Sequence, residues 1–474
     1  MSKTKCFLKS IAGAAGLSLV LLLYMNSNTL RLQEARRHAP PGQRHDDPFQ
    51  RVDHIGLLKG LQMEFLPNFK NPCWYEAVRV DKGSLQPSVL PFLPVQSSVQ
   101  HRHRNSNQSV DVLQCLPYFF LIGQPKCATT DIFYRIGCHP DVAEPPLKGP
   151  HWWSRKRFGM PHTAQPVPFS DYINLFNASK IQEEKQKSSE PQGTWEYPRI
   201  TGDGSTSTLW DSSQTMSYLH HLITTHKHKN ITKVLFSGRN EANTFPDSKK
   251  SSKIHSIIYE HYINGSNRSS ATQSGVVLPF TVADTIHLVL PKSRIIAVFR
   301  DPISRLYSSY LFFTKNADLS PQHFDDSVRS SIQKWNACIK QYSDRTCAYN
   351  KTLQKYLGVR LYNGLYSIYI KDWLQVFPQE QVLVLRMEDY QNNMNKTLEE
   401  IYNHLGLRSL MPDESKKLNI HKVYNKNKRK LSVGKMLQST RKILQDFYRP
   451  YNRDLVSILK NSKFSWEDIY QNCN

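Results

Sequence analysis

The chain has 474 residues, which is enough for one large domain or two ordinary ones with a sizeable core. Its 62 Lys and Arg residues outnumber 39 Asp and Glu, giving a formal net charge of +23. This charge indicates a polyanionic partner such as nucleic acid, acidic lipid or an acidic polysaccharide. The basic residues are dispersed and match no RNA- or DNA-binding motif, so we expect no nucleic acid partner. For many of them a merely solvated basic surface is the alternative.

The amino-terminal segment decides the expected compartment. Residues 10–25 are uncharged and largely apolar, and the low-charge stretch beginning at residue 6 has the length of about 20 residues that a spanning helix needs. A cleaved signal peptide is the alternative, but no small-x-small cleavage site follows Met25. We therefore expect a cytosolic tail at 1–9 and a signal-anchor transmembrane helix at 10–25.

The next segment, residues 26–70, is polar and basic, and it predicts a stem between the membrane and a lumenal domain at 71–474. Glycosylation sequons favour a lumenal location. They lie at Asn107, Asn177, Asn230, Asn264, Asn267, Asn350 and Asn395.

Cysteines are few and none has zinc spacing. Cys338 and Cys347 flank a short polar segment and are the expected disulfide pair. Cys73 with Cys115 is a second candidate pair.

The stretch 118–130, Y-F-F-L-I-G-Q-P-K-C-A-T-T, predicts a short buried strand, a tight turn and a helix from 131 to 136. We expect Thr129 or Thr130 to cap that helix. Free N–H groups at its start, together with Lys126, predict a site for a phosphate or sulfate ester. The stretch lacks the G-x-x-x-x-G-K-[ST] pattern of nucleotide triphosphatases. An ordinary turn with a surface lysine is the alternative.

Residues 150–159, P-H-W-W-S-R-K-R-F-G, interleave tryptophans with basic side chains. This pattern suits a groove in which aromatic faces stack on sugars and cations pair with sulfate or carboxylate. A buried tryptophan pair beside a solvated basic turn is the alternative. The stretch 195–207, W-E-Y-P-R-I-T-G-D-G-S-T-S, predicts the end of a strand in a Gly/Ser/Thr turn, and this turn either offers donors to a ligand or is an ordinary turn.

The stretch 293–310 predicts a buried strand ending at Arg300, followed by a helix that Asp301-Pro302 begins. Arg305 and Ser308 are three residues apart and share a face of that helix. Open α/β sheets bind ligands at the carboxyl ends of their strands, so we expect Arg300, Arg305 and Ser308 to converge on a phosphate. The alternative is an Arg300–Asp301 pair beside a helix of packing tyrosines.

The predicted fold class is α/β, with a central, mainly parallel sheet and helices on both faces. Strands are expected near Tyr118, Lys233, Ile295 and Val382, and a helix at 396–405. Residues 425–430 predict a basic loop.

Two of these motifs carry a resemblance to a known family. P-K-C-A-T-T, and F-R-D-P-x-x-R-x-x-S-x-Y about 170 residues later, resemble the 5′-phosphosulfate loop and the 3′-phosphate element of sulfotransferases. One departure is Ala128, where the family most often has glycine. Segments 446–452 and 464–466 resemble the carboxyl end of Golgi glycosaminoglycan sulfotransferases. With the loop, the block at 150–159 looks most like the N-acetylgalactosamine 4-sulfate 6-O-sulfotransferase branch, and the resemblance covers residues 73–466.

The resemblance implies a P-loop-like fold and transfer of a sulfuryl group from 3′-phosphoadenosine-5′-phosphosulfate (PAPS) to a sugar hydroxyl, without a metal. It implies a single-pass type II Golgi membrane protein acting on chondroitin or dermatan sulfate, at C6 of N-acetylgalactosamine 4-sulfate. A homodimer is one option for its assembly. The residues assigned in this way are Lys126 and His151 for catalysis; Lys126, Cys127, Ala128, Thr129, Thr130, Arg300 and Ser308 for PAPS; and His151, Trp152, Trp153, Arg155, Lys156 and Arg157 for the acceptor.

The general base is the open question. Related heparan sulfotransferases carry E-x-H-F-F or E-x-Q-F-F, in which the glutamate is the base, but here Gly149 occupies that position. His151 is our first candidate because its ordinary pKa lies near neutrality; Glu144 is the second, and a weakened activity is the third possibility. The competing functions are a PAPS- or glycosaminoglycan-binding protein without turnover and a type II Golgi glycosyltransferase. The latter would usually need an Asp-x-Asp motif, which the sequence lacks.

Overall fold

The computed structural model describes residues 64–79, 109–143, 147–159, 165–183, 195–216, 281–314, 319–419 and 432–471. The predicted anchor at 10–25, most of the stem, Glu144, the strand near Lys233 and the loop at 425–430 lie outside these ranges. Within them, no helix has both the length and the apolar character that crossing a membrane requires.

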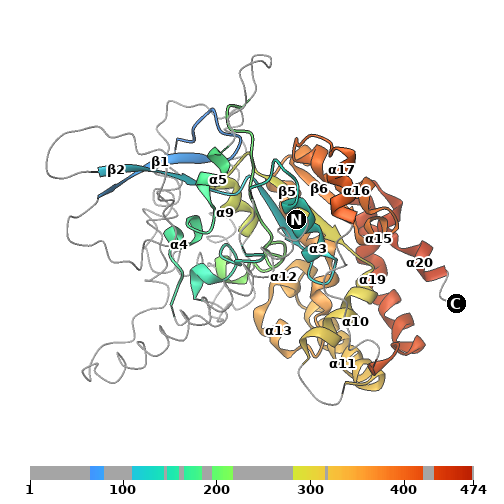
Figure 1. The fold of residues 1–474 in the computed structure, drawn as a ribbon. Coiled ribbons are helices and arrows are strands. Elements are labelled where there is room, and N and C mark those ends of the chain that lie inside the picture. The colour runs from blue at the N-terminus through green and yellow to red at the C-terminus, as the bar shows by residue number, and fades with distance from the viewer. Residues whose placement is uncertain are drawn as a thin grey trace, which may run out of the picture. The chain divides into compact units, whose positions relative to one another are not determined.

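A four-stranded parallel sheet forms the centre of the fold (Figure 1). Its spatial order is β4 (Gly202–Asp203), β3 (Phe119–Gly123), β5 (Arg294–Phe299) and β6 (Val382–Arg386). The strands near Tyr118, Ile295 and Val382 are therefore confirmed, as is their parallel pairing. Their nearly continuous apolar runs are typical of a sheet that is covered on both faces.

The strand predicted within residues 195–207 is present as the two-residue strand β4. Before it, the chain makes isolated bridges from Tyr197 to Phe69 and from Ile200 to Val142. A β-carbon at Gly202 would overlap the Phe119 ring on the neighbouring strand. Glycine there lets that ring pack directly over the backbone.

Side chains alternate between the two faces of the sheet. Phe119, Leu121 and Ile296 share one core with α3 (Thr129–Gly137) and α16 (Met394–His404). On the opposite face, the core is built by Phe120, Ile122, Ile295 and four helices: α9 (Val282–Val289), α10 (Pro302–Phe313), α14 (Tyr366–Val376) and α19 (Gln438–Leu459). Helices on both faces of a parallel sheet confirm the predicted α/β class, and α16 confirms the helix expected at 396–405.

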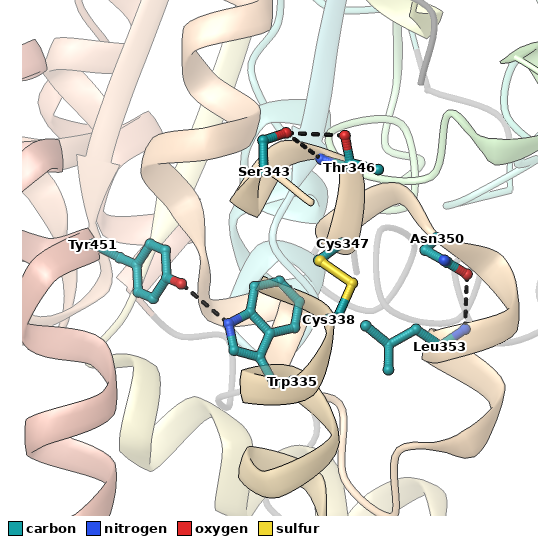
Figure 2. Close-up of a disulfide and its surroundings, with 8 residues drawn as sticks. All are labelled: Trp335, Cys338, Ser343, Thr346, Cys347, Asn350, Leu353 and Tyr451. Carbon is teal, nitrogen blue, oxygen red and sulfur yellow. Dashed lines mark hydrogen bonds between the residues drawn. A yellow bond between two sulfur atoms is a disulfide. The ribbon is translucent and has the colours of Figure 1, made fainter. Parts of the chain in front are cut away.

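The Cys338–Cys347 disulfide joins the end of α11 (Pro321–Ile339) to α12 (Asp344–Tyr349), as predicted (Figure 2). Beside it, Trp335 Nε1 donates to the Tyr451 hydroxyl of α19 at 3.2 Å. The Asn350 side chain caps α13 (Lys351–Tyr356) by accepting from the Leu353 N–H. The disulfide thus joins α11 to α12, and the Trp335–Tyr451 bond fastens this segment to α19.

The second predicted disulfide, Cys73–Cys115, is also present. It joins facing residues at one end of a separate antiparallel pair, β1 (Cys73–Arg79) and β2 (Ser109–Cys115). The shorter elements are η2 (Lys156–Phe158), α4 (Phe169–Ile173), α5 (Ala178–Gln182), η3 (Leu361–Gly364), η4 (Gln379–Gln381), α15 (Met387–Asn392), α17 (Pro412–Asn419), η5 (Ser462–Ser465) and α20 (Glu467–Gln471).

Candidate active site

The loop between β3 and α3 has an open helix start. Ala128 is the N-cap of α3, its φ is 56°, and no side chain caps the helix. The prediction that Thr129 or Thr130 caps the helix is wrong, because both residues lie within its first turn. The N–H groups of that turn have no partner inside the helix, so they suit an anion.

The same loop is fixed to the rest of the fold from two sides. The Gln124 N–H donates to the Val298 carbonyl of β5 at 3.0 Å. The Gln124 side chain donates to the Asn363 carbonyl of η3 at 2.5 Å. These bonds hold the loop at the carboxyl ends of β3 and β5, where open α/β sheets bind ligands.

The start of α10, by contrast, is already capped. The Asp301 carboxylate accepts from the N–H groups of Ile303 and Ser304 at 3.1 and 3.0 Å, and from the Tyr470 hydroxyl at 3.0 Å. The Asp301 carboxylate thus caps α10 and does not form the alternative pair with Arg300. The start of α3 is therefore open to an anion, whereas that of α10 is not.

Two cations lie at the loop. Arg300 Nη1 donates to the Lys126 carbonyl at 3.3 Å, which joins the end of β5 to the loop. The Lys126 ammonium lies 3.6 Å from the centre of the Phe312 ring. Burial, and then the charge of Arg300, lower the pKa of Lys126. A bound anion would relieve this repulsion, so the pair favours a negatively charged ligand.

The other two predicted phosphate donors differ in their surroundings. Ser308 is half-buried on α10. Arg305 has 0% of its surface exposed, and its Nη2 donates to the Arg360 carbonyl at 3.0 Å. Its guanidinium lies beside η3 and keeps Nε and Nη1 without a hydrogen-bond partner among the described residues, so the expectation that Arg305 reaches a phosphate stays a prediction.

Cys127 is also buried, and burial raises the pKa of its thiol to about 12. The thiol therefore stays protonated at neutral pH. Any contact that this residue makes with an anion comes from its backbone.

The tryptophans predicted to stack on sugars are core residues. Trp153 is fully buried and donates to the Tyr172 hydroxyl at 2.9 Å, while Trp152 stacks on the Tyr172 ring and donates to the Val167 carbonyl at 2.8 Å. Neither ring has a face open to a sugar, so the predicted stacking role is wrong for both. The buried alternative is the one that forms.

The basic residues that follow them separate into two groups. Arg157 is buried and donates to Thr215 Oγ1 at 3.1 Å, so it supports the core rather than the acceptor. Arg155 and Lys156 are half-buried, and Arg155 pairs with Asp211 at 2.5 Å. Burial lowers the pKa of Lys156. Arg155 and Lys156 thus stay candidates for an acidic acceptor.

His151 is held by the turn at 202–207. Its N–H donates to Ser205 Oγ at 2.8 Å, and its Nδ1 lies 2.6 Å from Ser207 Oγ. Burial, and then the charges of Arg155, Lys148 and Lys156, lower the pKa of His151 to about 3. The imidazole is therefore neutral at physiological pH, and with Nδ1 donating to Ser207 its Nε2 can accept a proton.

Gly149 is required by this arrangement. Its φ is +79°, and a β-carbon there would lie 2.9 Å from His151 Nε2. The absence of a side chain at Gly149 therefore makes room for the His151 ring.

Sequence reasoning missed an exposed aromatic pair beside Lys126. Phe312 and Phe313 end α10, with 53% and 40% of their surfaces exposed. The Arg360 guanidinium lies 3.9 Å from the centre of the Phe313 ring. The signal in the sequence was Y-L-F-F at 310–313, because four consecutive apolar residues on a helix cannot all face the core.

Comparison with known proteins decides the family. The sequence profile of the Sulfotransferase family matches residues 117–412, which is more than half of the chain. The chain belongs to the sulfotransferase family. Human carbohydrate sulfotransferase 15 is 32% identical over 469 residues, which cover 94% of this sulfotransferase and 72% of the human protein.

Two further relatives extend the comparison. Carbohydrate sulfotransferase 15 of Nototodarus sloanii is 36% identical over 139 residues, 29% of this chain and 87% of that protein. A crystal structure of a sulfotransferase from Alicyclobacillus acidocaldarius has 18% identity and a TM-score of 0.40, and the match covers 73% of this chain and 96% of that one.

The family implies PAPS as the sulfate donor, and the site of this sulfotransferase fits such a molecule. The uncapped start of α3 with Lys126 suits one phosphate-like end, and Arg300 with Ser308 offers donors for a second. In the described part of the chain, no three His, Cys, Asp or Glu side chains gather closely enough to hold a metal ion.

Proposed function

We propose that this sulfotransferase transfers a sulfuryl group from PAPS to a sugar hydroxyl of a sulfated galactosaminoglycan. The acceptor position would be C6 of N-acetylgalactosamine 4-sulfate in chondroitin or dermatan sulfate. The observation that carries the proposal is the open start of α3 beside Lys126, joined to Arg300 by the hydrogen bond between Arg300 and the Lys126 carbonyl. The net charge of +23 and the identity to carbohydrate sulfotransferase 15 support an acidic polysaccharide as acceptor.

The roles of the anion-site residues follow from their positions. Backbone N–H groups of Ala128, Thr129 and Thr130 and the Lys126 ammonium would hold the phosphosulfate end. Arg300 and Ser308 would hold the 3′-phosphate. When bound, PAPS supplies the sulfuryl group, and the positive charge of Lys126 stabilises the negative charge that develops on the leaving phosphate.

His151 would accept the proton of the sugar hydroxyl through Nε2. Its low pKa in this structure makes it a weak base, because it is half-buried among three cations. Anionic ligands beside Arg155, Lys148 and Lys156 would raise that pKa toward neutrality. A weakened transferase that mainly binds PAPS and the polysaccharide is the second candidate function, and the observation that favours it is Gly149 at the position where related heparan sulfotransferases carry the glutamate base.

The proposal includes a location in the cell. We propose a single-pass type II Golgi membrane protein, in which residues 10–25 span the membrane and the domain from residue 71 onward lies in the lumen. The apolar segment and the sequons support this location. A homodimer stays a prediction.

The test uses full-length protein, solubilised in detergent and incubated with radiolabelled PAPS and chondroitin sulfate A. The product is digested to disaccharides. We expect label in a 4,6-disulfated unit, and no label with Lys126→Ala. Tight PAPS binding without labelling would favour the binding function, whereas transfer from a sugar nucleotide would favour a glycosyltransferase. Absence of PAPS binding by folded protein would refute the proposal.

A further inference from the structure

The structure places an aromatic and cationic surface next to the anion site, which we call the Phe312–Arg360 platform. It consists of Phe312 and Phe313 at the end of α10 and Arg360 just before η3. Lys126 lies 3.6 Å from the Phe312 ring centre, the two phenylalanine ring centres are 4.8 Å apart, and Arg360 lies 3.9 Å from the Phe313 ring centre. A continuous series of contacts, each under 5 Å, therefore connects Lys126 with Arg360.

We propose that this platform binds the acidic polysaccharide acceptor: the phenylalanine rings contact sugar faces, and Arg360 pairs with a sulfate or carboxylate substituent. This inference rests on the proposed function and assigns the acceptor contacts that the buried tryptophans cannot make. The two rings meet almost at right angles, at 82°. They therefore present differently oriented apolar faces to one ligand.

The exposure of the two phenylalanine rings indicates a ligand-binding surface. Phe312 and Phe313 are neighbours in sequence and in space, and 53% and 40% of their surfaces are exposed. Adjacent exposed aromatic residues beside a functional site are typical of a binding surface rather than of packing. Aromatic faces suit the apolar C–H faces of sugars, and the flanking cations suit their acidic groups.

Arg360 is the residue suited to the acidic substituent. Among the described residues, no carboxylate forms an ion pair with it. Its backbone carbonyl is fixed by Arg305 Nη2 at 3.0 Å, while its guanidinium lies over Phe313. Burial lowers the pKa of Arg360, and the nearby charges of Arg155 and Arg305 lower it further. An arriving sulfate would relieve this excess of positive charge and can accept two hydrogen bonds from one guanidinium.

The test compares Arg360→Gln and Phe313→Leu with matched controls in full-length enzyme. Arg453→Gln replaces an exposed arginine on α19, and Tyr342→Leu replaces an aromatic residue with an exposure similar to that of Phe313, 45%, outside the platform. We expect each platform variant to raise the KM for chondroitin sulfate A about 10-fold, with the KM for PAPS and kcat changed less than about twofold. The Arg360→Gln effect should shrink at high salt. The controls should leave all three constants unchanged.

Unsulfated chondroitin separates the two kinds of acidic group. If Arg360 binds the sulfate, Arg360→Gln weakens only the sulfated acceptor; if it binds the carboxylate, both acceptors weaken equally. An unchanged acceptor KM in both platform variants, or an equal rise in the KM for PAPS, would overturn the inference. If wild-type enzyme transfers no sulfate, the proposed function fails. Direct binding of chondroitin sulfate A to wild type and to Arg360→Gln then decides whether the platform exists, and equal affinities refute it.

Discussion

Gly149→Ala tests whether the position of His151 matters for catalysis. The φ of +79° at Gly149 costs an alanine about 1–2 kcal/mol, part of which returns through the smaller entropy of the unfolded chain. The new β-carbon would also lie 2.9 Å from His151 Nε2, so the ring must move. That movement threatens the hydrogen bond between Nδ1 and Ser207, worth about 0.5–1.5 kcal/mol. We therefore expect a loss of about 2 kcal/mol in the free energy of unfolding.

The effect on activity should be larger than the effect on stability. If His151 is the base, displacing Nε2 should lower kcat about 100-fold while the KM for PAPS stays the same. The assay combines urea denaturation with transfer of labelled sulfate to chondroitin sulfate A. The substitution Gly149→Glu meets the same contact with His151, so it is a poorer probe of the base.

Gly406→Ala is the matched control. Its φ is +61°, so the backbone cost is similar, but its β-carbon would meet only the flexible end of Lys70, at 3.4 Å. We expect this variant to lose about 1 kcal/mol of stability and to keep its kcat. If Gly149→Ala were as active as Gly406→Ala, the His151 ring position would be irrelevant and the base would lie elsewhere.

Three further outcomes can be measured. Ala128→Gly relieves the strain of a φ of 56°, whereas Ala337→Gly, at an exposed position in α11, costs about 1 kcal/mol. The free energy of unfolding of Ala128→Gly should therefore be about 1–2 kcal/mol higher than that of Ala337→Gly. An equal loss of unfolding free energy in both variants, measured in urea, would contradict the left-handed conformation. The pKa of Lys148 is lowered to about 8, chiefly by burial and also by Lys126, so its ammonium is present below pH 8 and lost above it. Loss of this charge beside Lys126 should raise the KM for PAPS above pH 8, and Lys148→Arg should suppress that rise. The same lysine in the unfolded chain stays protonated to about pH 10, so its charged form opposes folding, and the free energy of unfolding should increase between about pH 8 and pH 10. Replacing Cys338 and Cys347 by serine opens a link between residues nine apart and should cost about 2–3 kcal/mol of unfolding free energy, whereas an unchanged urea midpoint would show that the disulfide contributes nothing.

The sequence by itself determined the elements whose signals are local. Apolar runs that end in Gly-Gln-Pro and Arg-Asp-Pro identified β3 and β5 with the helices that follow them, and parallel pairing brought the two motifs to one edge of the sheet. These strands and helices depend on the order of neighbouring residues, which the sequence states directly. Both disulfides were among the candidate pairs, but the sequence alone did not fix the pairing of Cys73 with Cys115, which lie 42 residues apart.

The tertiary structure decided which side chains of each motif reach the site. The sequence could not show that Tyr172 and Val167 bury the two tryptophans, or that η3 receives the Arg305 guanidinium. The sequence also predicted Thr129 or Thr130 as the helix cap, but the N-cap of α3 is Ala128, in the left-handed conformation. Exposure depends on segments that pack from far along the chain. The tryptophans of the 150–159 motif are therefore buried, and the exposed aromatic surface beside Lys126 belongs to Phe312 and Phe313.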